Sequence, residues 1–103
     1  MKDKQELQAE ALRKAEASLY QAVVSLRNVE ECDAFFHDLC TPAELQAFID
    51  RWAVVCLLRK GMTYRDINEQ TGVSVTTVGR VARFLADGYG GYQKVAERLG
   101  TEQ

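Results

Sequence analysis

The sequence predicts an all-α protein of six helices, with a helix-turn-helix at residues 63–85. Apolar residues recur at steps of three and four along most of the chain, and no run alternates with a period of two. Ser or Thr start signals and boundary glycines separate the helical segments. The 103 residues, 47% hydrophobic and 27% charged, fit one domain spanning residues 1–103.

The first helix is expected over residues 3–27. Its apolar positions Leu12, Ala15, Leu19, Val23 and Leu26 follow helical spacing. Further apolar residues widen this stripe in the second half of the helix, so more than one packing partner is expected, which points to a dimer. Residues 1–10 are polar, and we expect them to fray.

A shorter helix is expected over residues 30–39, with the aromatic pair Phe35 and Phe36 facing inward. The next helix has the clearest start signal in the chain. Thr41 is the expected N-cap, Pro42 occupies the first helical position and Glu44 completes a capping box. This helix is expected to run to about residue 60, before Gly61. Its apolar residues expected to be mostly buried are Leu45, Phe48, Ile49, Trp52, Val55, Cys56 and Leu58.

Residues 63–85 read as helix, tight turn, helix. Thr63 can cap the first helix, Gly72 can take the positive φ that ends it, and Ser74 can cap the second. The branched residues Ile67, Val73, Val78 and Val81 are spaced to lock the two helices together. On the opposite side of the second helix lie Thr76, Arg80 and Arg83.

Small polar and cationic side chains on an outward helix face are typical of a helix-turn-helix that reads the DNA major groove. The alternative is a structural hairpin that touches no DNA.

The chain then continues through a glycine-rich loop at residues 87–92, whose tyrosines we expect to pack back onto the domain, and a closing helix over residues 93–99.

The charge distribution along the chain favours DNA binding by the helix-turn-helix. Residues 1–50 carry five Lys/Arg against ten Asp/Glu, whereas residues 51–103 carry eight against five, so an acidic half precedes a basic one.

The three cysteines and the single histidine, His37, do not form a metal-ligand set. We therefore expect no metal, no cofactor, no catalysis and no membrane span, and we expect reduced cysteines in a cytoplasmic protein.

The chain resembles the Trp repressor family, and within it the YerC/YecD type. The residues that carry the resemblance are 39–45 (Leu-Cys-Thr-Pro-Ala-Glu-Leu) leading into Arg51, residues 57–63 (Leu-Leu-Arg-Lys-Gly-Met-Thr), the helix-turn-helix and the Gly-Tyr-Gly-Gly-Tyr loop. The resemblance extends from about Leu19 to Leu99. It implies a six-helix intertwined homodimer that binds double-stranded DNA through two helix-turn-helix heads.

Carried over residue by residue, the resemblance places seven residues near DNA. They are Tyr64, Arg65 and Asn68 in the first helix of the motif, and Val75, Thr76, Gly79 and Arg80 in the second. Arg83, from the helix spacing, and Ser74 and Thr77, at the start of the second helix, complete the candidate DNA-binding set.

The resemblance also locates a corepressor pocket. Thr41, Arg51, Thr77 and Arg80 match positions that hold tryptophan in the Trp repressor type. However, Val81 stands where a glycine makes room for the indole, and Phe84 where a serine meets the amino group of the ligand. We expect these two side chains to fill the cavity, so L-tryptophan is not the expected effector, and whether another small molecule binds stays open.

The sequence thus predicts a sequence-specific DNA-binding transcriptional regulator, most simply a repressor. The rival function is a helical homodimer whose head binds a protein partner and whose DNA affinity is vestigial. The salt dependence of DNA binding separates the two, because contacts to phosphates impose a steep dependence.

Overall fold

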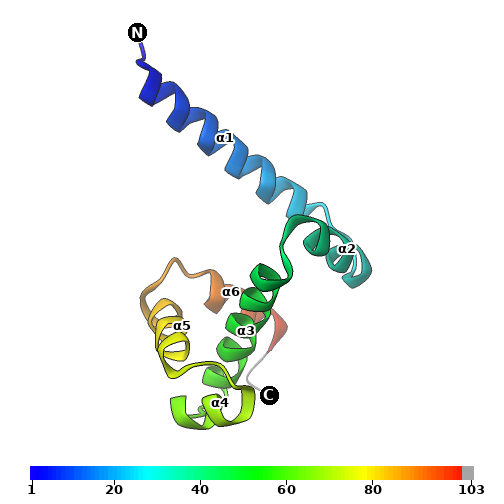
Figure 1. The fold of residues 1–103 in the computed structure, drawn as a ribbon, viewed down its shortest axis with the longest axis vertical. Coiled ribbons are helices and arrows are strands. Elements are labelled where there is room, and N and C mark those ends of the chain that lie inside the picture. Colours follow the sequence, from blue (N-terminus) through cyan, green and yellow to red (C-terminus); the bar gives the residue numbers. More distant parts are fainter. Residues whose placement is uncertain (101–103) are drawn as a thin grey trace. The chain divides into compact units, whose positions relative to one another are not determined.

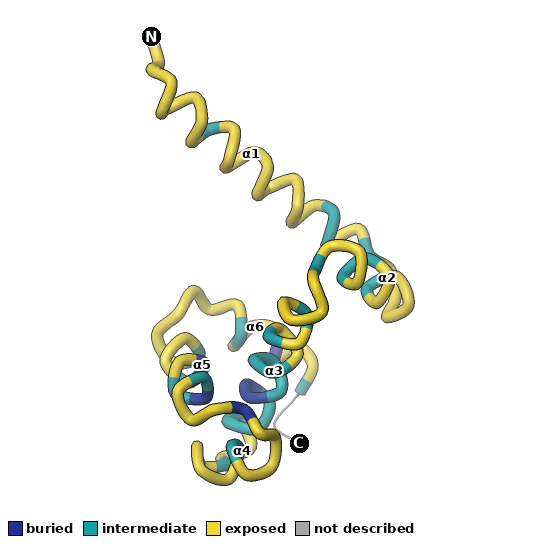
Figure 2. The backbone as a smooth tube through the Cα atoms, in the orientation of Figure 1, coloured by how far each residue is buried: buried dark blue, intermediate teal, exposed yellow. Residues whose placement is uncertain are grey.

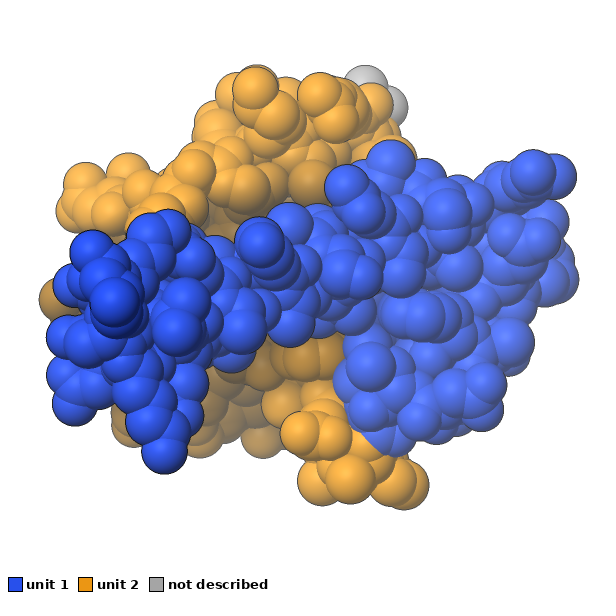
Figure 3. All heavy atoms as spheres, turned by 90° about the horizontal axis from the view of Figure 1, so that it is seen from above, with its two compact units in different colours: residues 1–40 blue, residues 41–103 orange. Residues whose placement is uncertain are grey.

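The computed structural model describes residues 1–100, and in that range it forms six α-helices and no strand (Figure 1). The helices are α1 (Lys4–Val24), α2 (Val29–Leu39), α3 (Pro42–Arg59), α4 (Tyr64–Thr71), α5 (Val75–Asp87) and α6 (Gly91–Leu99). The predicted all-α class and the order of its elements are confirmed. The chain divides into two compact units, residues 1–40 and residues 41–103, which Figure 3 shows in blue and orange.

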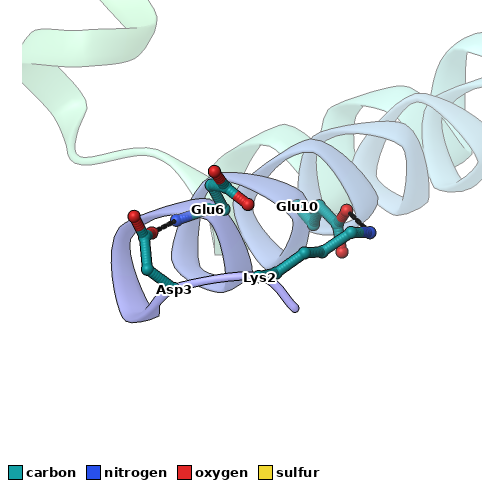
Figure 4. A network of polar contacts seen from close by, with 4 residues as sticks. All are labelled: Lys2, Asp3, Glu6 and Glu10. Atoms are coloured by element: carbon teal, nitrogen blue, oxygen red, sulfur yellow. Dashed lines mark hydrogen bonds and ion pairs between the residues drawn. The ribbon is translucent and has the colours of Figure 1, made fainter.

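In the first unit, side chains fix the start of each helix. The Asp3 carboxylate accepts a hydrogen bond from the Glu6 amide at 2.8 Å, and Lys2 pairs with Glu10 (Figure 4). Asn28 caps α2 in the same way, through the amide of Glu31 at 2.8 Å. This cap explains why α1 ends at Val24 rather than near residue 27, since the chain must leave the helix to place Asn28 in extended backbone.

No residue of α1 or α2 is buried within the single chain. Several of their large apolar side chains are exposed, including Leu12 at 70%, Val24 at 82% and Val29 at 78% of their reference areas. The aromatic pair Phe35 and Phe36 makes an edge-to-face contact with ring centroids 5.5 Å apart, and both residues remain partly exposed. This unit therefore has no core of its own.

The second unit contains the core. Helix α3 packs against α4, α5 and α6, and α5 also packs against α4 and α6. The buried segments, dark blue in Figure 2, belong to these helices and to the turn between α4 and α5. The core residues are Val54, Val55, Ile67, Val73, Val78, Val81 and Ala96.

The predicted capping box of α3 is formed. The Thr41 hydroxyl accepts from the Glu44 amide at 3.2 Å, and the Glu44 carboxylate accepts from the Thr41 amide at 2.8 Å. The backbone bond from Thr41 holds the pKa of the Glu44 carboxyl below its usual value of 4.5.

The prediction that most apolar residues of α3 are buried was wrong for the single chain. Only Val54 and Val55 are buried, whereas Phe48 and Ile49 are 46% and 52% exposed. One face of α3 meets α4, α5 and α6, and helical periodicity cannot distinguish that face from one that needs a partner from outside the chain.

Candidate nucleic-acid interface

Helix α4 begins where the sequence predicts. The Thr63 hydroxyl accepts from the Asp66 amide at 3.1 Å, which satisfies one of the free donors of the first turn. Ile67 then points into the core and is fully buried. Tyr64 and Arg65, on the other side of the helix, are exposed.

The turn between α4 and α5 is tight. Gly72 has φ +78°, and its amide donates to the carbonyl of Asn68 at 2.8 Å, which closes α4. Val73 follows and is only 8% exposed, so the turn is anchored to the core. The Asn68 side-chain amide donates to the Val73 carbonyl at 2.9 Å. The resemblance placed Asn68 near DNA, and in the structure its side chain bonds to the turn.

Ser74 begins α5. Its hydroxyl accepts from the Thr77 amide at 3.1 Å and donates to the Thr77 hydroxyl at 3.0 Å. Both hydroxyls predicted to lie near DNA are therefore hydrogen-bonded to each other at the start of the helix. The remaining free amides of the first turn of α5 lie at a helix N-terminus, where anionic groups bind favourably.

Helix α5 has an inner and an outer face. Val78 and Val81 are buried against the core, with 0% and 2% of their areas exposed. The outer residues Val75, Thr76, Arg80 and Arg83 are all exposed. Gly79 lies between the two faces, beside the ring of Tyr64. The structure thus places the outward side chains that the sequence predicted on one exposed face of α5.

The arginines of this region are held weakly or not at all by acidic groups. Arg65 pairs with Glu69 at 3.3 Å, but both side chains are largely exposed, and such pairs contribute little. The Arg80 guanidinium lies 5.9 Å from the ring centroid of Phe84, a cation–π arrangement that restrains it without neutralising its charge. These cations remain available to a polyanion.

A polar hollow of about 480 Å³ lies beside the turn, between α3 and α5. Three of the predicted corepressor residues, Arg51, Thr77 and Arg80, line it. The rest of its wall consists of Ala47, Asp50, Gly72, Val73 and Ser74. Its charged groups are one carboxylate and two guanidiniums.

The other three predicted pocket residues lie elsewhere. Thr41 caps α3, Val81 belongs to the core, and Phe84 lines a separate apolar cavity. Neither Val81 nor Phe84 lines the hollow, and their filling of a corepressor cavity stays a prediction. The chain places Val81 one residue beyond Arg80 on α5, which turns it inward while Arg80 faces the hollow.

Sequence reasoning missed Asp50. Its carboxylate lies in the wall of the hollow and accepts from the Gln46 side chain at 2.8 Å. Helical spacing could have found it, because Asp50 and Arg51 stand three and four residues after Ala47 and share its face. The Arg51 guanidinium also donates to the Ala47 carbonyl at 3.2 Å.

The apolar cavity is a second feature of this unit, with a volume of about 420 Å³. Its lining residues are Trp52, Phe84, Tyr89, Gly91, Tyr92 and Val95. Tyr92 packs against the core as expected, but Tyr89 is fully exposed. The expectation that the loop tyrosines pack back onto the domain was therefore wrong for Tyr89, which is fully exposed in the reversal between α5 and α6.

Within residues 1–100 there is no cluster of three or more His, Cys, Asp or Glu side chains that could hold a metal ion. The same part of the chain contains no helix that is both long and apolar enough to cross a membrane. The three cysteines are free thiols, each partly exposed.

Comparison with known proteins agrees with this geometry. Residues 14–100 match the family model of the Trp repressor protein. The uncharacterized protein YerC of Bacillus subtilis (strain 168) is 39% identical over 94 residues, which are 90% of this chain and 90% of YerC.

Two solved structures share the fold. A TrpR-like protein from Eubacterium eligens ATCC 27750 superposes with a TM-score of 0.83 at 42% identity, over 87% of this chain and 93% of that one. A Trp repressor-like protein from Staphylococcus aureus gives a TM-score of 0.84 at 38% identity, over 93% and 97% of the two chains. The family match indicates a DNA-binding regulator, and it covers both α5 and the turn that precedes it. The chain belongs to the Trp repressor family.

Proposed function

We propose that the protein is a sequence-specific transcriptional regulator, acting as a repressor in the cytoplasm, that binds a near-palindromic DNA site as a homodimer. The observation that carries this proposal is the outer face of α5. Thr76, Arg80 and Arg83 are exposed on it, while the inner face of the same helix is anchored in the core. A rigid helix with exposed cationic and small polar side chains is what major-groove readout requires.

Two kinds of contact are expected on this face. Arg65, Arg83 and the first amides of α5 would bind phosphates, which supply affinity without sequence information. Thr76 and Arg80 would hydrogen-bond to base edges, and Val75 could meet a thymine methyl. Arg80 stands in the middle of the face, so it is the residue on which specificity most depends.

The homodimer is supported by the state of the first unit. No residue of its two helices is buried, and large apolar side chains are exposed along their length. Exposed apolar patches on a soluble protein mark interaction sites, so this number of exposed apolar side chains on α1 and α2 favours a partner. A second copy would cover these side chains and would also present two reading heads, which accounts for a site with two half-sites.

The test uses a DNA site that the purified wild-type protein has selected from genomic fragments. Arg80→Ala is titrated against this selected site and against a scrambled duplex. If Arg80 reads a base, the variant loses about 1–3 kcal/mol on the selected site and discriminates less at one position. Equal loss on both duplexes would make Arg80 a phosphate contact.

Analytical ultracentrifugation of the free protein tests the dimer, and a monomer at micromolar concentration would contradict it.

We propose that L-tryptophan is not the effector. Val81 and Phe84 stand where the Trp repressor type has a glycine and a serine that admit the ligand, and Val81 is buried in the core at 2% exposure. Calorimetric titration should show no micromolar binding of tryptophan, and binding at that level would refute the proposal.

The rival function is a homodimeric protein-interaction module. Its prediction differs in one measurable respect, because vestigial DNA binding would be weak and nearly independent of sequence. Partner binding would then survive the Arg80→Ala/Arg83→Ala double substitution. We also propose that the protein is not an enzyme. Its one histidine, His37, pairs with Asp33 in the first unit, and the two side chains are 65% and 71% exposed. This pair is remote in sequence from the helix-turn-helix, so it offers no catalytic group there.

A further inference from the structure

The turn before α5 is held by side chains of α4. Val73 is nearly buried, and both its backbone polar groups bond to side chains rather than to backbone. Its carbonyl accepts from the Asn68 amide at 2.9 Å, and its amide donates to the Thr71 hydroxyl at 3.1 Å. The Thr71 hydroxyl donates in turn to the carbonyl of Ile67 at 2.7 Å, which is a core residue.

These bonds act at the point that sets the direction of α5. Val73 immediately precedes Ser74, the N-cap of that helix, and the Ser74 carbonyl accepts the first backbone bond of α5 from Val78 at 2.9 Å. Buried backbone groups are costly to leave unpaired, so the two side chains restrict the conformations open to the turn. Gly72 on its own could not do this, because glycine tolerates many backbone conformations.

We propose that Asn68 and Thr71 are positioning residues of the reading head: they fix the orientation of α5 rather than contact DNA. The proposal rests on the DNA-binding function proposed above. It differs from the placement of Asn68 near DNA that the family resemblance implies, because the Asn68 side chain already donates one N–H to the Val73 carbonyl, which orients the amide toward the turn.

The mechanism is preorganisation. A head in which α5 is correctly oriented only one-tenth of the time binds its site about tenfold more weakly, although every DNA-contacting residue is still present. Loss of a positioning residue should therefore lower affinity without changing the number of phosphates that the protein neutralises. Loss of a phosphate contact would lower both the affinity and its dependence on salt.

Amide hydrogen exchange of the free protein tests the bond at Thr71 without DNA. Thr71→Val removes the hydroxyl and keeps the branched shape, whereas Thr71→Ser keeps the hydroxyl. We expect exchange at Val73 to accelerate about tenfold or more in Thr71→Val and to stay within a factor of two of the wild type in Thr71→Ser. Gln70→Ala, an exposed substitution on the same helix, is the matched control and should behave as the wild type.

DNA titration at several salt concentrations tests the functional consequence. Asn68→Ala and Thr71→Val should each weaken binding to the selected site about tenfold or more, with the salt slope and the base preference unchanged, and Thr71→Ser should restore affinity. All variants are compared well below their unfolding midpoints, with circular dichroism as the check on folding.

Three results would overturn the proposal: a reduced salt slope in Asn68→Ala, equal affinity of Thr71→Val and wild type, or failure of Thr71→Ser to restore binding. If the wild-type protein binds no DNA, the proposed function fails, and the exchange measurement still decides whether the side chains hold the turn.

Discussion

Gly79 lies in the middle of α5, and its replacement by alanine should separate stability from DNA binding. A Cβ atom built at this position would meet the ring carbon Cε2 of Tyr64 at 3.7 Å, which is ordinary van der Waals contact. The substitution therefore creates no clash. Glycine inside a helix is less favourable than alanine by about 0.5–1 kcal/mol, so Gly79→Ala should raise the free energy of unfolding by that amount.

The expected gain corresponds to an increase of a few degrees in Tm for a chain of this size. If α5 enters the major groove at Gly79, the added methyl group stands between the helix backbone and the DNA, and affinity should fall while stability rises. Chemical denaturation and DNA titration of the same preparation measure both effects. Ala82→Gly, one turn further along α5, is the reciprocal control and should lose about the same stability.

Two outcomes would contradict this placement of Gly79. A less stable Gly79→Ala protein would mean that the surroundings of this glycine are tighter than the structure shows. A more stable protein with unchanged DNA affinity would mean that Gly79 does not lie at the DNA surface, and the position of α5 in the proposed complex would then be wrong.

Further predictions concern the core, the α3 cap and the dimer. Ile67→Ala should cost about 2–5 kcal/mol by chemical denaturation, because Ile67 on α4 is fully buried in the core; a loss under 1 kcal/mol would contradict that packing. Thr41→Ala should cost about 0.5–2 kcal/mol through loss of the cap, and Thr41→Ser, which keeps the hydroxyl, should cost less. The lowered pKa of Glu44 means that the folded state binds fewer protons than the unfolded chain just below pH 4.5, so this contribution is present above that pH and is lost as the pH falls through the folded-state pKa. Comparison of wild type with Glu44→Gln across pH 2–7 should therefore show a stability difference that shrinks in acid, and a constant difference would contradict the linkage. Unfolding of a dimer depends on protein concentration, so Tm should rise as the protein is concentrated, and a constant Tm would argue for a monomer.

The sequence predicted best what depends on neighbouring residues. The caps at Thr41, Thr63 and Ser74 each involve an amide three residues away, and all three form as expected. The positive φ of Gly72 follows from the same local chemistry. The inward positions of Val78 and Val81 follow from helical periodicity once the turn is placed.

What the sequence could not provide depends on contacts outside the local pattern. The exposure of Phe48 and Ile49 follows from the way that α3 shares its faces, because periodicity marks a residue as apolar without saying whether this chain or another covers it. The bond from Asn68 to Val73 crosses a non-helical turn, where no spacing rule applies. Asp50 was missed because an acidic residue on a helix is usually only a solvated side chain.

The central claim is that the exposed face of α5 reads DNA, and selection from fragmented genomic DNA by the purified protein at two salt concentrations tests it most directly. We expect enrichment of a pseudo-palindrome, with half-sites about one helical turn apart, whose binding weakens steeply as salt rises. Retention that is independent of sequence and nearly independent of salt would contradict DNA reading by α5 and favour a protein-interaction module.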